Sequence, residues 1–241
     1  MRQTEGLVGS ILAVLKVAGA VADHSTLSRR RATLAVAVPR TRGTAALPVV
    51  GASTGMKGFG AGEGKGRQPG STYRRTGRQG PLGVDEASGE IVAAVVTTTN
   101  DSDSQVLPDW LEQVDEEVKQ VSGDGGYDRR TCYEALRKRP ARATIPPQRH
   151  AKIWPHGNTQ AERWARAQNL RRSRQSGRAA WKRESGYHRR SLAETTRFRL
   201  KTIFSDRVTA RGFAGQAAQV LVRCVTLNRL TALGMPESYA V

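Results

Sequence analysis

Cysteine is scarce in this sequence, and long apolar runs are absent from it. The two cysteines, Cys132 and Cys224, are far apart and match no metal-ligand spacing, which argues against a disulfide framework or a zinc site and favours a reducing compartment. No run reaches the length that a membrane-spanning helix needs. We therefore expect a cytoplasmic protein with no membrane partner. The 241 residues and 38% apolar content allow one medium-sized α/β domain with a small appendage.

Acidic residues are also in short supply. The chain carries 39 Lys plus Arg against 21 Asp plus Glu, which gives a formal net charge of +18. Residues 129–211 hold 23 basic and only 5 acidic residues, whereas residues 85–128 are acidic. A basic channel beside an acidic region suits a phosphate backbone held near metal ions, so nucleic acid is the expected partner. The alternative is a solvated basic surface that only aids solubility.

The N-terminal region predicts two helices, at residues 3–17 and 26–33, with Asp23 or Ser25 capping the second. The apolar run that ends at Ala22 also resembles a signal peptide. The helix is favoured because acidic and basic residues interrupt that run and its apolar residues recur at helical spacing.

The second of these helices carries Arg29 and Arg30 after a glycine-containing turn, which is a weak helix-turn-helix pattern. Two ordinary packing helices are the alternative interpretation. We divide the chain into a helical region with a possible DNA-binding remnant at 1–43, a central domain at 44–207, and a C-terminal helical segment at 208–241.

The central domain alternates between apolar strands and amphipathic helices. Strands are predicted at residues 46–52, 82–85, 91–98, 120–123 and 143–145, and helices at 107–118 and 128–139, the last with Asp128 as its N-cap. The order βββαβαβ, followed by a further helix, is that of an α/β RNase H-like fold, a mixed sheet flanked by helices. Residues 58–80, rich in Gly and Arg, form a basic loop or a damaged hairpin in this interpretation.

The sharpest pattern lies in a predicted helix over residues 182–204. Tyr187, Arg190, Glu194 and Lys201 fall within an arc of about 60° on that helix, at about 100° per residue. Four side chains on the opposite side are expected to pack on the sheet: Leu192, Thr196, Leu200 and Ile203.

The residue types on that arc have a chemical rationale. Glu194 can ligate a divalent metal ion, Arg190 and Lys201 can hold phosphate oxygens on either side of it, and Tyr187 can stack on a base or donate to a phosphate. A solvated helix with ordinary Glu–Arg and Glu–Lys pairs is the alternative.

The four residues also carry a resemblance. They form the pattern Y-x2-R-x3-E-x6-K, which resembles the Y-R-E-K motif of insertion-sequence transposases. The strings at 180–191 (AWKRESGYHRRS) and 227–236 (LNRLTALGMP) resemble the group related to insertion sequence "five". Residues 123–128 (GDGGYD) resemble the block around the second catalytic aspartate of that family. The likeness covers nearly the whole chain.

This resemblance implies a DDE-type domain that cleaves and joins DNA strands by two-metal phosphoryl transfer. In the family, two Mg²⁺ (or Mn²⁺) ions are held by two Asp and one Glu, and Asp124 and Glu194 match the second and third of these ligands. The first does not match, because relatives carry Asp-Ser-Thr-Gly where this chain has Ala52 followed by Ser-Thr-Gly. Alanine has no oxygen to offer a metal, so the sequence predicts impaired catalysis. Asp85 is an alternative ligand, although its side chain is expected to face the other way.

Other departures from the family indicate a decayed copy of a mobile element. Pro81 removes a ladder donor at the start of the second strand, and two glycines loosen the approach to it. A further N-terminal helical segment of the family is expected to be missing. A non-catalytic remnant that binds element ends, or that inhibits an active relative in mixed complexes, is the alternative function. A basic nucleic-acid-binding protein of other ancestry is the third.

The expected partner is duplex DNA, both element ends and target, with a possible homo-oligomer on the DNA. The residues predicted to contact it are Tyr187, Arg190, Lys201, Lys182, Arg183, Arg29 and Arg30.

Overall fold

A computed structural model describes most of the chain. The described residues are 1–39, 46–58, 77–98, 101–154 and 165–234. Most of the glycine- and arginine-rich stretch at 58–80, and the expected boundary between residues 43 and 44, lie outside them.

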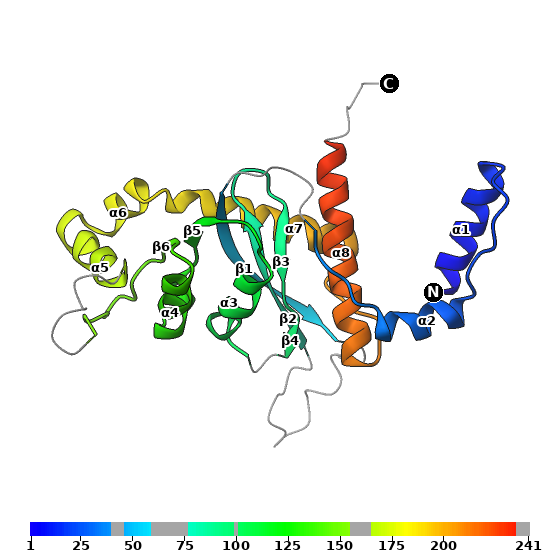
Figure 1. Cartoon of the computed structure of the whole chain (residues 1–241), viewed down its shortest axis with the longest axis horizontal. Coiled ribbons are helices and arrows are strands. Elements are labelled where there is room, and N and C mark those ends of the chain that lie inside the picture. The colour runs from blue at the N-terminus through cyan, green and yellow to red at the C-terminus, as the bar shows by residue number, and fades with distance from the viewer. Residues whose placement is uncertain (40–45, 59–76, 99–100, 155–164, 235–241) are drawn as a thin grey trace, which may run out of the picture.

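The centre of the molecule is one mixed sheet (Figure 1). Its strands are β1 (Leu47–Lys57), β2 (Gly77–Asp85), β3 (Ile91–Ala94), β4 (Thr97–Thr98), β5 (Val118–Ser122) and β6 (Arg142–Thr144). The order is β3-β2-β1-β5-β6, with β4 also on β2. The pairs among β1, β2 and β3 are antiparallel, whereas β5 runs parallel to β1 and β6 parallel to β5. Helices cover both faces, and the predicted α/β RNase H-like fold is confirmed.

Alternate residues of β1 bury their side chains in two different cores, because successive strand residues point to opposite faces. Val49 joins a core with α3 (Asp103–Glu112) and α4 (Arg130–Lys138). Ala52 joins the other, with α7 (Ser191–Phe204) and α8 (Phe213–Leu233). The side chain of Asn228 on α8 both donates to and accepts from the backbone of Ile91, which fixes α8 against β3. In the described part of the chain, no helix combines the length and apolar character needed to cross a membrane.

The two predicted N-terminal helices are present as α1 (Arg2–Val14) and α2 (His24–Thr33). Asp23 is the cap of α2, since its carboxylate accepts a hydrogen bond of 2.7 Å from the backbone N–H of Ser25. Helix α2 contacts α8, whereas α1 has no buried residue and projects away from the sheet (Figure 1).

Two strand predictions need correction. Strand β1 does not stop at Ala52 but continues to Lys57, and β2 begins at Gly77 rather than Leu82. Pro81 does not prevent this pairing: it lies opposite Ser53 on β1 and opposite the gap between β3 and β4. The absent N–H therefore falls where the neighbouring ladder is already interrupted.

The prediction of a helix at 107–118 is also wrong in its bounds. Helix α3 begins at Asp103, behind a capping box of Ser102 and Gln105, and ends at Glu112 because Val118 belongs to β5. Asp128 is not a helix cap: Arg129 holds that position without a side-chain bond, while the buried carboxylate of Asp128 pairs with Arg166. A partner 38 residues away thus replaces the expected local contact.

The predicted helix at 182–204 is broken into parts. They are α6 (Arg178–Glu184), a 3-10 turn (Tyr187–Arg190) and α7, preceded in the chain by α5 (Ala165–Ser176). Gly186 has φ +73°, a left-handed conformation that ends α6. The buried face of α7 consists of Ala193, Thr196 and Leu200, so the expectation that Leu192 and Ile203 pack on the sheet is wrong, at 41% and 49% exposure.

Candidate functional site

Asp124 follows the end of β5 and stands at the edge of the sheet. The parallel register pairs Val50 with Ser122, so Asp124 comes level with Ala52 two residues further along. Its Oδ1 accepts a hydrogen bond of 2.7 Å from the N–H of Gly126, which caps the 3-10 turn Gly125–Tyr127. The side chain is 52% exposed, so the second oxygen remains accessible.

Glu194 lies on the first turn of α7, where arginines hold both of its oxygens. Arg190 Nη2 is 3.1 Å from Oε1, and Arg197 Nη2 is 2.9 Å from Oε2. The same Arg190 reaches Asp124, with Nη1 3.6 Å from Oδ2. The structure therefore brings Asp124 and Glu194 together from β5 and α7, with the Arg190 guanidinium between them.

The resemblance predicts a third acid near these two carboxylates, at position 52, where this chain has alanine. Its side chain is 6% exposed and belongs to the same core as Ala193, the residue before Glu194. Arg197, which holds Glu194, also donates to the carbonyl of Ser53 at 3.4 Å. A carboxylate at position 52 would thus enter the α7 face of the sheet beside the arginine-bound glutamate.

Asp85 does not take the place of that missing acid. It pairs with Val49 across the ladder, three residues from Ala52. Its carboxylate accepts from the hydroxyl of Ser88 at 2.6 Å and from the N–H of Ala87 at 3.1 Å, within the turn between β2 and β3. Asp85 therefore stabilises that turn.

Tyr187 lies in a group of aromatic and cationic side chains. Its ring is 6.2 Å from that of Trp181, 5.1 Å from Nζ of Lys182 and 5.7 Å from the guanidinium of Arg190. Burial raises the pKa of the Tyr187 phenol, with Arg190 opposing the rise, so the phenol stays protonated and can donate. A phenol between two cations is suited to a phosphate oxygen.

The remaining predicted DNA contacts are spread over the molecule. Arg183 is exposed on α6, and Lys201 lies two turns beyond Glu194 on α7, about 10 Å along its axis. Arg29 and Arg30 are exposed on α2, at the opposite end of the molecule from α6 (Figure 1). The predicted contacts thus form at least two separate surfaces.

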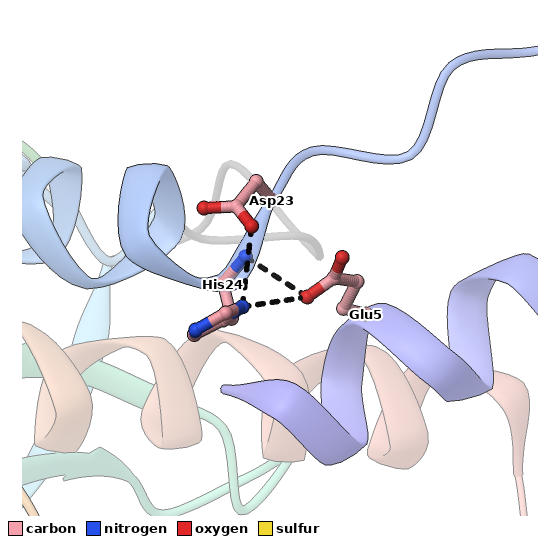
Figure 2. Close-up of side chains that lie close together, drawn as sticks. All are labelled: Glu5, Asp23 and His24. Atoms are coloured by element: carbon pink, nitrogen blue, oxygen red, sulfur yellow. Dashed lines mark hydrogen bonds and ion pairs between the residues drawn. The ribbon is translucent and has the colours of Figure 1, made fainter.

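Sequence reasoning missed a second group of acidic side chains. Figure 2 shows Glu5 of α1 beside Asp23 and His24 at the start of α2, with His24 Nδ1 3.0 Å from Glu5 and 3.2 Å from Asp23. Among the residues that the structure describes, these three form the only group of three or more whose metal-ligating atoms all lie within 4.8 Å of one another. Arg2 Nε lies 3.4 Å from His24 Nε2, which leaves Nδ1 to donate to the carboxylates. These three side chains therefore connect α1 to α2. Pattern reasoning does not find them, because Glu5 and His24 are 19 residues apart in the sequence.

The residues at the sheet edge do not fit a pair of divalent ions. The resemblance predicts a shared metal ligand at position 52, where alanine offers no oxygen, and both oxygens of Glu194 already face guanidinium groups. Asp124, exposed and held by Arg190 only at 3.6 Å, is the carboxylate best placed to accept a cation.

An RNase H-like sheet with an aspartate after the strand beside β1 and a glutamate on the later helix α7 defines a class of nucleic-acid-processing domains. Comparison with known families agrees. The model of the family described as "Transposase DDE domain" matches residues 52–229, well over half of the chain, and a second model with the same description matches residues 1–61. The chain belongs to the DDE transposase family, and the predicted membership is confirmed. No solved structure matches the chain.

Proposed function

We propose that this protein is an insertion-sequence transposase that binds the DNA ends of its element and that has lost strand cleavage and joining. The family supports a transposase with DNA as its substrate. The basic residues around Tyr187 support DNA binding, since phosphate neutralisation supplies most of the affinity for a duplex.

The observation that carries the loss of catalysis is Ala52. In two-metal phosphoryl transfer, a shared carboxylate offsets the repulsion between cations about 3.5–4 Å apart, and those cations serve the attacking and leaving oxygens. Ala52 is buried in the same core as Ala193, and its side chain has no oxygen that could do so. The arginine pairs of Glu194 leave a site of low net charge, which attracts metal ions weakly.

The test uses duplex DNA that contains the element ends, with Mg²⁺ or Mn²⁺. We expect the unmodified protein to shift end DNA in a gel without nicking it. Ala52→Asp is expected to gain metal-dependent nicking, whereas Ala52→Asn, which has the same shape without the charge, is not. Nicking by the unmodified protein that Asp124→Ala abolishes would refute the proposed loss.

Ala52 also supports a second candidate function, the inhibition of an active relative. A chain that binds ends without cutting them occupies the sites of an active relative, or enters mixed complexes with it. Adding this protein to an active transposase with the same ends should then lower its cleavage rate. Unchanged cleavage at saturating end binding would exclude inhibition.

A further inference from the structure

The three side chains that connect α1 to α2 bring metal-ligating atoms together on the N-terminal helices (Figure 2). Glu5 lies on α1, and Asp23 and His24 lie at the start of α2. His24 Nδ1 is 3.0 Å from Oε2 of Glu5 and 3.2 Å from Oδ2 of Asp23. The three ligating atoms all lie within 4.8 Å of one another. An imidazole nitrogen and two carboxylate oxygens from two segments of the chain therefore converge on one point.

The separations between these atoms match the geometry of a zinc site. Zn²⁺ binds an imidazole nitrogen at about 2.0–2.1 Å and a carboxylate oxygen at about 2.0–2.2 Å, so two ligands of a tetrahedral ion lie about 3.3 Å apart. The two contacts of His24 Nδ1, at 3.0 and 3.2 Å, differ from that separation by only a few tenths of an ångström. Small side-chain rotations are therefore enough to admit the ion.

Hydrogen bonds alone do not satisfy both carboxylates. Nδ1 of His24 carries at most one proton, and Oε2 of Glu5 is placed to accept it. Oδ2 of Asp23 faces the same nitrogen, whereas its Oδ1 accepts a hydrogen bond of 2.7 Å from the backbone N–H of Ser25 and so caps α2. A metal ion on Nδ1 would take the place of the single proton and contact both carboxylates at once. Because Oδ2 is the ligating oxygen, the cap on Oδ1 stays in place.

The cluster is also open to an ion from solvent. The side chains of His24, Glu5 and Asp23 are 37%, 36% and 53% exposed, so a water molecule can complete the coordination shell. The two carboxylates balance the double charge of the ion. Arg2 opposes binding, because its Nε lies 3.4 Å from Nε2 of His24, which takes the ring proton when Nδ1 binds a metal. The side chain of Arg2 is exposed and can rotate away.

We propose that Glu5, Asp23 and His24 bind one Zn²⁺ ion through Oε2, Oδ2 and Nδ1, and that this ion fixes α1 against α2. An imidazole ligand favours Zn²⁺ over Mg²⁺, which prefers oxygen ligands. Helix α1 has no buried residue, so it has little apolar packing to hold it in position. Since α2 contacts α8, an ion between α1 and α2 connects α1 to the rest of the protein. The site lies outside the family's carboxylates and does not depend on the proposed function.

The experiment is a Zn²⁺ titration of the intact protein in excess Mg²⁺, with a chromophoric chelator as competitor. We expect one Zn²⁺ ion per chain, and an affinity lower by about tenfold or more in His24→Ala, because one of three protein ligands is lost. Asp23→Asn should also weaken binding while α2 stays folded, since Asn and Asp are equally good N-caps. The matched control is His150→Ala, which removes another exposed histidine and should bind as the unmodified protein does.

Hydrogen exchange tests the structural consequence. Zn²⁺ should increase the protection of the amides of residues 5–14 in the unmodified protein and in His150→Ala, and should leave it unchanged in His24→Ala. Equal Zn²⁺ affinity in His24→Ala and the unmodified protein would overturn the inference, as would no binding at all. Equal losses in His24→Ala and His150→Ala would also overturn it, because they would show adventitious binding to surface histidines. Gel shifts with end DNA in the same samples report on the proposed function separately.

Discussion

The guanidinium of Arg166 lies against the carboxylate of Asp128 in the interior of the protein, with Nε 2.6 Å from Oδ1. A second contact, Nη2 to Oδ2 at 3.2 Å, makes the pair bidentate, and the guanidinium is 3.9 Å from the centre of the Trp154 ring. The carbonyl of Lys152 accepts from Nη1 at 2.7 Å. The start of α5 is thus fixed to Asp128, two residues before α4 begins.

Breaking this pair should be costly. Arg166→Met leaves the buried carboxylate of Asp128 without its main partner, so we expect the free energy of unfolding to fall by about 3–5 kcal/mol. The control is Arg172→Met, which breaks the exposed pair with Glu184 and should cost less than about 1 kcal/mol. Urea unfolding followed by tryptophan fluorescence measures both, and equal losses would contradict the structural role of Arg166.

The cations in the last turn of α6, Lys182 and Arg183, should contribute to DNA affinity. Lys182→Ala combined with Arg183→Ala is expected to weaken binding to all duplexes and to flatten the salt dependence by about one unit per lost phosphate contact. Lys119→Ala with Lys138→Ala, which removes the same charge from exposed positions on β5 and α4, serves as the control. An equal change in both double variants would assign the effect to net charge alone.

Placing an aspartate at position 52 should have a stability cost that metal relieves. The side chain enters a buried core, so Ala52→Asp is expected to lower the free energy of unfolding by about 1–3 kcal/mol without metal. Mg²⁺ should restore part of it, since a ligand that binds only the folded state stabilises it. Thermal unfolding with and without Mg²⁺ tests this, and Ala52→Asn should show the cost without the recovery.

The buried carboxylate of Glu86 is expected to destabilise the fold at neutral pH. Glu86 is 4% exposed, and neither oxygen has a hydrogen-bond partner in the described part of the chain. Burial raises the pKa of this carboxyl, and Arg189 at 4.0 Å opposes the rise. Because the folded state holds the proton more tightly than the unfolded state, stability present at low pH is lost as the pH rises through the folded pKa.

Glu86→Gln should therefore raise the free energy of unfolding at pH 7 by roughly 1 kcal/mol. The gain should disappear in acid, where the carboxyl of the unmodified protein is already protonated. Denaturant unfolding across the acidic to neutral range checks this, with exposed Glu112→Gln on α3 as the control. A loss of stability at pH 7 would show that the ionised carboxylate is favourable.

The order of strands and helices along the chain was predictable, because alternating apolar segments and turn residues are local signals. The position of Asp124 and Glu194 near one another followed from the same order. The break before α7 was not recognised, although Gly186 is a local signal for it. Asp128 looked like a helix cap because the arginine that binds it comes much later in the chain.

The left-handed residue Gly186 separates the predicted DNA contacts of α6 from the carboxylate on α7. Lys182 and Arg183 are carried on α6, whereas Glu194 is carried on α7, which is fastened to the sheet by Ala193 and Leu200. A small rotation at the glycine would let α6 follow the contour of a duplex while the sheet edge stays fixed. Mutations could then change the affinity for DNA without changing the chemistry of the carboxylates, and the reverse. Under the proposed function, a chain with alanine at position 52 would therefore lose strand cleavage and keep its affinity for the ends of its element.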